Sequence, residues 1–583
     1  MNTLKTMHPQ YSSNHRSLAA AALAAFAIVA ILPVAHAADV TLTAGTYNDT
    51  QTYNNGTISG VVIFDSGANY TFDSLNLPLA WNRVTLNSGA ALNVGGNLSV
   101  DVSGVSLNGG TLTTGGLLLH DSPNWNGSYN DGKQTLEYGD SIINGATIVA
   151  NQSNANFISL ASSPGGYSWA VANNLWIGSD GATIDSSSHN IGITMSMYDY
   201  GGAGKLIKTS SGTLTLTAYN GYTGGTTVNQ GTLEVVGSST GNSYIRGTVT
   251  VNSGAELRFT GGDGTGFGFN GGNKLDTINI NGGLVNTQGI HAHVWGTAVN
   301  MTGGELRSNS GISSPSGSQL EWNQSTVTTS PSASTATISG RINLRDDGGY
   351  SSAIFNVNNG SAITDLLVSA AITQNSAVGI TKNGTGTMEL TGTNSYTGAT
   401  TVSAGTLLVN GNNAAATGAV SVASGATLGG TGTLGGAVSV TGIIAPGNSI
   451  GTLNTGTTTW LGAASGSAAT DWQFELGAGN SSDKLAINGD FLRDASLGTT
   501  FRFDFMDSNF TGTFRLITWT GASSAGWSLG DFSYDPASLG GGRTGVFTFN
   551  TTDKYLDFTV IPEISNILII GLLGSGMWRR RRL

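Results

Sequence analysis

Two similar segments that align without a gap, separated by a long stretch of other sequence, constrain the fold of this chain more than any other feature. Residues 212–233 read GTLTLTAYNGYTGGTTVNQGTL, and residues 386–407 read GTMELTGTNSYTGATTVSAGTL, with no gap in the alignment. Units of this size cannot bury an apolar face alone, so repeats of them must stack on neighbours. The chain is therefore expected to form a repetitive, elongated structure.

Within each segment, apolar and polar residues alternate with the period of a β-strand. Leu214 and Leu216 alternate with Thr, so they share one face of a strand, and Tyr222 follows in a turn that it would fill. Lys208 and Lys382 also occupy matching positions. The positions that shape the two units are Leu214, Leu216, Tyr222, Gly224, Gly231 and Leu233 in the first and Leu390, Tyr396, Gly398, Gly405 and Leu407 in the second.

A shorter pattern occurs three times, at residues 84–92, 249–257 and 420–428. Each copy has two apolar residues at alternate positions, then a Ser-Gly corner, then another Leu. This order is typical of one edge of a coil whose apolar residues point inward. Nothing in these segments has the period of an α-helix, so the sequence predicts an all-β solenoid.

The composition agrees with a coiled β-fold outside the cytoplasm. Gly contributes 87 of 583 residues, roughly twice the usual share. A chain that turns every few residues needs many positions with positive φ, which Gly adopts at little cost. The chain has no Cys, which excludes disulfides and thiol chemistry. The formal net charge of −11 argues against nucleic acid as a partner, since phosphates require Lys and Arg.

The two long units resemble the autotransporter-associated β-strand repeat of bacterial passenger domains. The Gly-rich stretch at residues 429–436 and the following residues 445–453 are also similar to segments that such passengers carry late in the solenoid. The resemblance implies a right-handed parallel β-helix and a surface or secreted location. Residues 461–560 are too few for the outer-membrane barrel that ends an autotransporter, so a β-region that caps the last coil is expected there.

The N-terminus has the pattern of a secretory signal peptide. Basic residues precede an apolar, Ala-rich run over residues 18–32, and a small-x-small cleavage site follows at Ala35, Ala37 and Ala38. The sequence therefore predicts export through the Sec translocon and removal of residues 1–37 by signal peptidase.

The C-terminus resembles a PEP-CTERM sorting tail, which exosortases are thought to process. Pro562 and Glu563 form the motif, although Ile561 and Ile564 stand where the family has Val and a second Pro. An apolar run over residues 564–578 predicts a short hydrophobic helix, which is marginal as a membrane span. The basic stop consists of Arg579, Arg580, Arg581 and Arg582. A plain membrane anchor is the alternative interpretation.

Few residues suggest catalysis or metal binding. His291 and His293 would share one face of a strand, but the sequence offers no third ligand. Asp346 and Asp347 are adjacent, so they would point to opposite faces of a strand and would form a poor glycosidase pair. Trp295 and the other aromatic residues outside the repeats could stack on sugars, although burial is the simpler expectation. We expect no enzyme activity, no metal and no cofactor.

These observations predict a secreted or cell-surface structural or adhesive protein of extracellular matrix, sorted by an exosortase-type membrane enzyme. The alternative is an extracellular protein that binds or degrades polysaccharide. The expected divisions are a signal peptide at 1–37, a β-rich region at 38–200, a β-helix at 201–460 with repeats at about 204–237 and 379–411, a capping region at 461–560 and a sorting signal at 561–583.

Overall fold

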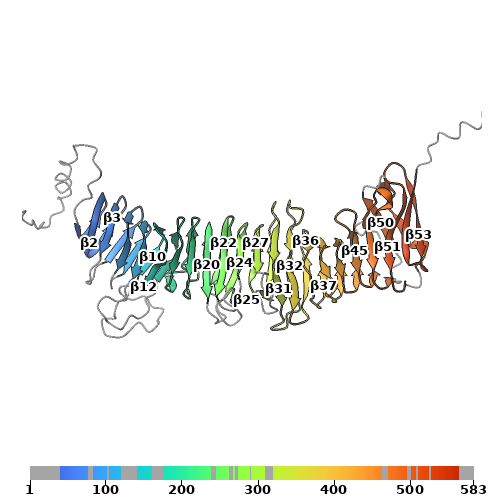
Figure 1. Cartoon of the computed structure of the whole chain (residues 1–583), viewed down its shortest axis with the longest axis horizontal. Coiled ribbons are helices and arrows are strands. Elements are labelled where there is room, and N and C mark those ends of the chain that lie inside the picture. The colour runs from blue at the N-terminus through green and yellow to red at the C-terminus, as the bar shows by residue number, and fades with distance from the viewer. Residues whose placement is uncertain are drawn as a thin grey trace, which may run out of the picture.

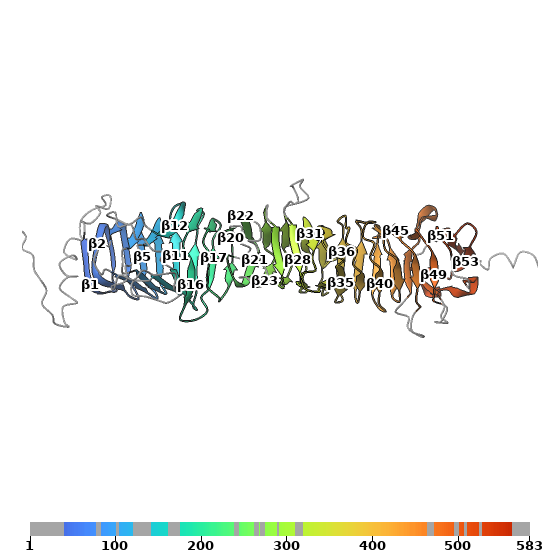
Figure 2. The same ribbon diagram turned by 90° about the horizontal axis from the view of Figure 1, so that it is seen from below.

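The chain folds into a long, straight rod of stacked β-coils, with the N-terminal coils at one end and the C-terminal strands at the other (Figures 1 and 2). The prediction of an all-β solenoid is confirmed: nearly all strand pairs are parallel, and short 3-10 turns are the only helices in the described part of the chain. The computed structural model describes residues 40–76, 83–100, 104–119, 141–160, 175–237, 244–261, 267–268, 274–288, 291–308, 319–462, 471–494, 501–506, 510–523 and 527–562.

The strands follow three faces of the rod, and the chain visits the faces in turn. Three long strands form the N-terminal end: β1 (Val40–Tyr47), β2 (Thr50–Phe64) and β3 (Asn69–Asn76). The second face is continuous and contains β5 (Ala91–Val94), β8 (Thr111–Thr114), β11 (Ala146–Ala150), β14 (Ala182–Asp185), β17 (Leu206–Thr209), β19 (Thr226–Val228), β21 (Gly247–Asn252), β23 (Leu275–Asn281), β26 (Ala298–Met301), β29 (Thr326–Thr329), β32 (Ser352–Asn356), β35 (Gly379–Asn383), β37 (Thr400–Val402), β40 (Val420–Val422), β43 (Val438–Val440), β46 (Thr458–Trp460) and β49 (Phe491–Arg493).

The third face runs beside it over nearly the same length. It contains β6 (Asn97–Val100), β9 (Gly116–Leu119), β12 (Asn154–Leu160), β15 (Ile191–Ile193), β18 (Thr213–Leu216), β20 (Gly231–Gly237), β22 (Ala255–Gly261), β24 (Leu284–Thr287), β27 (Glu305–Ser308), β30 (Ala336–Ser339), β33 (Leu366–Val368), β36 (Thr387–Leu390), β38 (Thr406–Val409), β41 (Thr427–Gly430) and β44 (Ile443–Pro446). A separate sheet of three strands follows: β47 (Trp472–Glu475), β50 (Phe501–Met506) and β52 (Phe532–Tyr534).

The first face is divided into three separate runs of strands. The first run contains β4 (Arg83–Asn87), β7 (Val105–Asn108), β10 (Ser141–Asn144), β13 (Leu175–Gly178) and β16 (Met197–Tyr200). The middle run is a four-stranded sheet of β25 (His291–Trp295), β28 (Gln319–Asn323), β31 (Arg341–Leu344) and β34 (Ala371–Gln374). The last run contains β39 (Asn412–Asn413), β42 (Thr433–Leu434), β45 (Thr452–Thr455), β48 (Lys484–Ile487), β51 (Gly512–Trp519), β54 (Tyr555–Ile561) and β53 (Thr544–Asn550).

Successive coils pair in the same register, so side chains of the same kind stack on one another inside the rod. On the third face Leu214 pairs with Leu233, and Leu233 pairs with Leu257. On the second face Val228 pairs with Val251. All five side chains are fully buried. Since alternate residues of a strand point to opposite faces, each coil adds its inward residues to one continuous core.

The outer surface carries matching columns of polar side chains. The Nδ2 of Asn252 donates to Oδ1 of Asn229 at 2.8 Å, and Nδ2 of Asn281 donates to Oδ1 of Asn252 at 3.3 Å. Such amide ladders satisfy polar groups between coils without ionic charge. They explain how a chain with only 10% charged residues can cover its long sides with hydrogen-bonded side chains.

Both repeat units bury a lysine beneath a turn. Lys208 points into the core, and its ammonium donates to the carbonyl oxygens of Thr209 at 2.8 Å, Ser210 at 2.7 Å and Gln230 at 3.1 Å. Because Gln230 belongs to the next coil, one cation closes a turn and joins two coils.

Lys382 makes the same arrangement in the second unit. Its ammonium donates to the carbonyls of Asn383, Gly384 and Ala404 at 3.2, 2.7 and 2.9 Å. Burial lowers the pKa of Lys208 and of Lys382 to about 8, and the fields of nearby carboxylates oppose that shift only in part. The sequence placed these lysines at matching positions, and the structure gives the reason.

Each unit also buries a tyrosine in the turn that leads to its third strand. The hydroxyl of Tyr222 shares a hydrogen bond of 2.6 Å with Oγ1 of Thr226, and that of Tyr396 shares one of 2.8 Å with Oγ1 of Thr400. The apolar repeat positions are likewise buried: Leu214, Leu216, Leu233, Leu390 and Leu407.

The paired glycines of the two units serve two purposes. A Cβ on Gly224 would lie 2.3 Å from the carbonyl oxygen of Ala203, and one on Gly398 would lie 2.2 Å from the backbone nitrogen of Gly379, so neighbouring coils approach too closely for any side chain. Gly231 and Gly405 have φ of +68° and +62°, a left-handed conformation that favours glycine.

The C-terminal end differs from the rest of the rod. β53 and β54 pair antiparallel, and β54 also pairs antiparallel with β51. Aromatic rings fill the space beneath them; for example, Phe505 and Phe558 stack with their centroids 4.3 Å apart. Large apolar rings in contact supply substantial buried area to the last coils.

We predict that replacing both buried lysines, in the variant Lys208→Met, Lys382→Met, lowers the free energy of unfolding at pH 7 by about 2 kcal/mol per site, because buried carbonyls lose their donors. The exposed Lys205→Met is the matched control and should change little. Denaturant unfolding checks both. Equal stability of the two variants would contradict the role of the buried ammoniums.

The same lysines predict a dependence on pH. Their folded pKa of about 8 lies below the ordinary value of 10.5, so between these values the unfolded chain binds more protons than the folded chain. The free energy of unfolding of the natural chain should therefore rise with pH over this range, relative to the double Met variant. A parallel pH profile for the two proteins would refute this.

We also predict that Gly398→Ala lowers the free energy of unfolding by about 1–3 kcal/mol, because its methyl group would collide with the backbone of the adjacent coil. Gly530→Ala is the control, since its nearest neighbour would be Oγ of Ser528 at 3.7 Å. Thermal unfolding compares the two, and a shift no larger for Gly398→Ala than for the control would be inconsistent with the close approach.

Candidate functional site

The middle sheet of the first face carries the richest polar chemistry of the described rod. In β28 Leu320 and Trp322 point into the core, whereas Gln319, Glu321 and Asn323 point outward. These outward side chains are nevertheless buried, with residue exposures of 8%, 4% and 2%. Long side chains from the neighbouring β25 and from the turn after β31 cover them, which makes a sheltered polar cluster on an otherwise solvated side.

Glu321 is the centre of this cluster. Its carboxylate accepts from Nδ2 of Asn343 at 2.9 Å, from Nη1 of Arg345 at 3.0 Å and from the side-chain amide of Gln319. Nδ1 of His291 lies 3.4 Å from it. Burial raises the pKa of Glu321, but the hydrogen bonds from these donors outweigh burial and hold the pKa below its ordinary value. Glu321 is therefore an ionised, fully engaged acceptor that orders its neighbours.

Arg345 connects this carboxylate to a second one. Its Nε donates to Oδ2 of Asp347 at 2.6 Å, and its Nη2 donates to Oδ1 at 3.3 Å, while Nη1 reaches Glu321. The hydrogen bonds from Arg345 hold the pKa of Asp347 below its usual range. The guanidinium also lies 5.8 Å from the centre of the Trp295 ring. One cation thus bridges two carboxylates and borders an aromatic ring.

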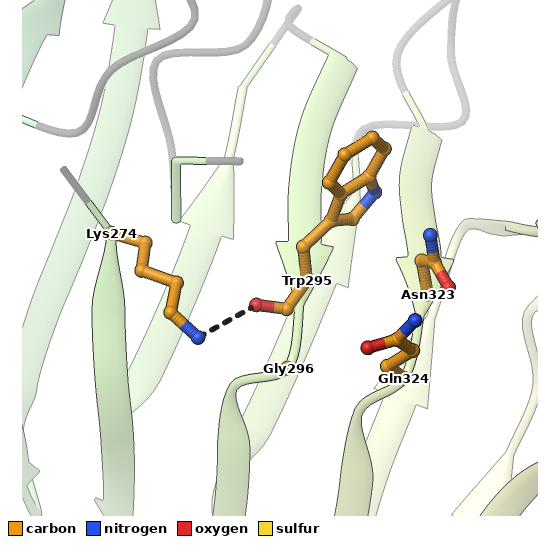
Figure 3. Close-up of a pocket in the computed structure, with 5 residues that line it drawn as sticks. All are labelled: Lys274, Trp295, Gly296, Asn323 and Gln324. Carbon is orange, nitrogen blue, oxygen red and sulfur yellow. Dashed lines mark hydrogen bonds between the residues drawn. The ribbon is translucent and has the colours of Figure 1, made fainter. Parts of the chain in front are cut away.

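A small pocket opens beside this cluster (Figure 3). Five residues line it: Lys274, Trp295, Gly296, Asn323 and Gln324. They border a shallow hollow of about 230 Å³, a volume that includes space open to solvent. The ammonium of Lys274 donates to the carbonyl oxygen of Trp295 at 3.4 Å, and the amide side chains of Asn323 and Gln324 lie across from it (Figure 3). Three coils therefore contribute to one hollow, since these residues adjoin β23, β25 and β28.

Two features of the pocket are costly for a purely structural surface. Oδ1 of Asn323 is buried and has no hydrogen-bond partner among the described residues, although Asn323 is only 2% exposed. Gln324 has a φ of +54°, a left-handed conformation that L-residues other than glycine seldom adopt. Unsatisfied polar atoms and backbone strain of this kind concentrate at functional sites.

The structure separates the residues that the sequence suggested as a metal or catalytic pair. His291 and His293 do share the outer face of β25, but His291 contacts Glu321 and the ring of His293 lies 5.4 Å from that of Trp295. Among the described residues we find no group of three or more His, Asp or Glu arranged to hold a metal ion.

Asp346 and Asp347 lie in the turn after β31 and act apart from each other. Oδ1 of Asp346 accepts from the backbone nitrogen of Tyr350 at 2.6 Å, which closes the turn, whereas Asp347 bonds Arg345. The turn therefore contributes to the site by holding the side chain of Arg345 in place.

The predicted sorting residues fall mostly outside the described residues. These are Ala35, Ala37, Ala38, Glu563, Arg579, Arg580, Arg581 and Arg582, together with the expected hydrophobic helix over 564–578. Pro562 is described, and it is exposed directly after β54. No helix in the described part of the chain has the length and apolar character that crossing a bilayer requires.

Sequence reasoning missed Glu321, Arg345, Lys274, Asn323 and Gln324. A usable signal existed for β28, since Gln319, Glu321 and Asn323 alternate with Leu320 and Trp322 in a chain that has few charges. Lys274 gave no signal, because it joins the pocket only through the stacking of separate coils.

We predict that Glu321→Gln lowers the free energy of unfolding at pH 7 by about 1–3 kcal/mol, because Arg345 and Asn343 lose a charged acceptor. Since the pKa of Glu321 is lowered, its contribution is present above the ordinary value of 4.5 and is lost as the pH falls through the folded pKa. Glu321→Gln should therefore flatten the acid side of the stability profile.

The control for this variant is Glu389→Gln. The bonds that Glu389 accepts within the described chain come from neutral donors, Thr364 at 3.1 Å and Asn410 at 2.8 Å. Denaturant unfolding from pH 3 to 7 compares the two variants. An acid profile that Glu321→Gln leaves as steep as that of the natural chain would contradict the assignment.

Comparison with known families bears on the two repeat units. The family model of the passenger-associated-transport-repeat matches residues 206–235 and 380–409, which are the coils with the buried lysines. The search of curated proteins found no match. The resemblance to autotransporter-associated repeats is thus confirmed, whereas the PEP-CTERM resemblance stays a prediction. Passenger-type repeats on a parallel β-solenoid indicate a secreted passenger that is exposed at the cell surface.

Proposed function

We propose that this chain is a non-enzymatic structural or adhesive protein of the extracellular matrix or cell surface. The observation that carries the proposal is the long solenoid itself, which contains two passenger-type repeats. A rod that is stabilised coil by coil can extend far from a surface without a compact globular core. Its outer surface carries columns of hydrogen-bonded Asn side chains, which are suited to contact with hydrated polymers.

The proposed route to that location uses both ends of the chain. The signal pattern before Ala38 would engage the Sec translocon and signal peptidase. The apolar segment 564–578 and the four arginines would then hold the C-terminus in the inner membrane until an exosortase-type enzyme cuts near Pro562. The exposed position of Pro562 after the last strand supports access for such an enzyme.

A second candidate function is binding of extracellular polysaccharide. The pocket at Trp295 favours it, because it combines an aromatic ring, two amides and an ammonium in one hollow. The engagement of Glu321 and Asp347 by Arg345 favours binding over hydrolysis, since a glycosidase needs carboxyl groups free to exchange protons with the substrate.

We predict that a host with an exosortase releases a product that starts near Ala38 and lacks the residues after about Glu563. A host without the enzyme should retain the Arg-tailed chain in its inner membrane. Intact mass and cell fractionation measure both. The variant Pro562→Ala, Glu563→Ala is the matched control, and it should stay in the membrane even when the enzyme is present. Retention of the natural chain in both hosts would contradict the sorting route.

A further inference from the structure

We propose that the pocket formed by Lys274, Trp295, Gly296, Asn323 and Gln324 binds an acidic sugar residue of an extracellular polysaccharide. The proposal rests on the extracellular location proposed above, and it names the ligand class of a site on the side of the rod. A uronic acid unit, with a carboxylate and several hydroxyls, has the chemistry that this hollow matches.

One polar atom of a residue that lines the pocket has no hydrogen-bond partner among the described residues, and a ligand would supply one. Oδ1 of Asn323 is removed from solvent and accepts no hydrogen bond within the described chain. A buried acceptor without a partner is destabilising, and a small rotation of the Asn323 side chain toward the hollow would let a sugar hydroxyl donate to it. The left-handed backbone at Gln324 holds the second amide at the rim of the same hollow.

The groups that converge on the pocket suit a sugar. Amide side chains offer both donors and acceptors, which adjacent sugar hydroxyls require. Trp295 also lines the hollow, and its indole is held beside the ring of His293 and the guanidinium of Arg345, so it would offer a fixed apolar edge to the C–H groups of a pyranose ring. The hollow is shallow, and its volume of about 230 Å³ includes space open to solvent, so it would contact one edge of a sugar unit whose polymer continues into solvent.

The charge of the pocket favours an acidic unit. The described hydrogen bond of the Lys274 ammonium is a single long one of 3.4 Å to the carbonyl of Trp295, so the ammonium has donors left for a ligand. Arg345, the other cation nearby, is already engaged by Glu321 and Asp347. A carboxylate that enters the pocket would therefore meet Lys274 and form a charge-assisted hydrogen bond.

The arrangement of the coils leaves room for a polymer. Residues at the ends of β23, β25 and β28 line the pocket, and β23 and β28 lie in the middle part of the rod, away from both of its ends (Figure 2). Next to it the outer side of the middle sheet continues as amides, with Nδ2 of Asn343 donating to Oδ1 of Asn375 at 3.0 Å. A chain bound at the pocket can therefore pass along hydrated, hydrogen-bonding surface in either direction.

The test uses the full chain, purified from the cells that make it, and two oligosaccharides of equal length. One is an oligogalacturonate and the other is a neutral cello-oligosaccharide. Titration calorimetry should show tighter binding of the oligogalacturonate, with an affinity that falls as salt is added. Lys274→Met should weaken this binding about tenfold or more, and Lys274→Arg should restore part of it.

Matched variants separate recognition from folding. Lys205→Met changes an exposed lysine elsewhere on the rod and should leave the affinity unchanged. Gln324→Ala should weaken binding of the oligogalacturonate while it keeps the unfolding midpoint close to that of the natural chain. Since Gln324 and Lys274 lie at the rim and not in the core, a loss of binding with an intact fold reports on the pocket.

Three results would overturn the proposal: no binding of either sugar, stronger binding of the neutral sugar, or equal binding by the natural chain and Lys274→Met. None of these depends on secretion, because the purified chain is titrated directly. A failure of sorting in the fractionation experiment with binding intact would instead contradict the proposed route and leave the sugar site standing.

Discussion

Each coil of this rod depends on the coil that follows it, because one turn of short strands cannot bury the side chains that point inward. The pairing of Leu214 with Leu233, and of Leu233 with Leu257, shows how the dependence is met: the same inward position recurs in the same register. The buried ammoniums of Lys208 and Lys382 also join neighbouring coils, because each donates a hydrogen bond to a carbonyl oxygen of the next coil. Register is therefore the quantity that the sequence has to specify, and a slip by one residue would expose every inward side chain.

The candidate site exists because the first face departs from that regularity. Where β25, β28 and β31 form a separate sheet, their outward positions carry Trp295, Glu321 and the residues before the Arg345 turn in place of Thr and Ser. Arg345 bridges two carboxylates there and donates hydrogen bonds to both, which lets a charged cluster become buried on the outside of a sheet. The polar network orders the long side chains and leaves the pocket beside it with a fixed shape. The repetitive core thus makes the rod rigid, and one irregular sheet carries the polar groups of the candidate site.

The fold could be predicted from the sequence because its signals are local. The alternation around Leu214 and Leu390 fixes strands, and the recurrence of the whole unit requires stacking. The site could not be predicted in the same way. Lys274, Trp295 and Asn323 meet only because successive coils, each of a different length, bring them side by side. His291 and His293 were correctly placed on one strand face, but their partners, Glu321 and Trp295, depend on that same coil-to-coil register and on the turn that positions Arg345.

The place of the middle sheet along the rod has a mechanical consequence. From β25 the first face passes through nine coil steps to reach β51, and parallel strands are spaced about 4.8 Å apart, so the pocket stands roughly 40 Å from the C-terminal strands. The number of coils between them sets this standoff. Gain or loss of a repeat such as 380–409 would lengthen or shorten the arm by a fixed increment and leave the pocket itself intact. In such a molecule, reach and recognition are set by separate stretches of chain and can change independently.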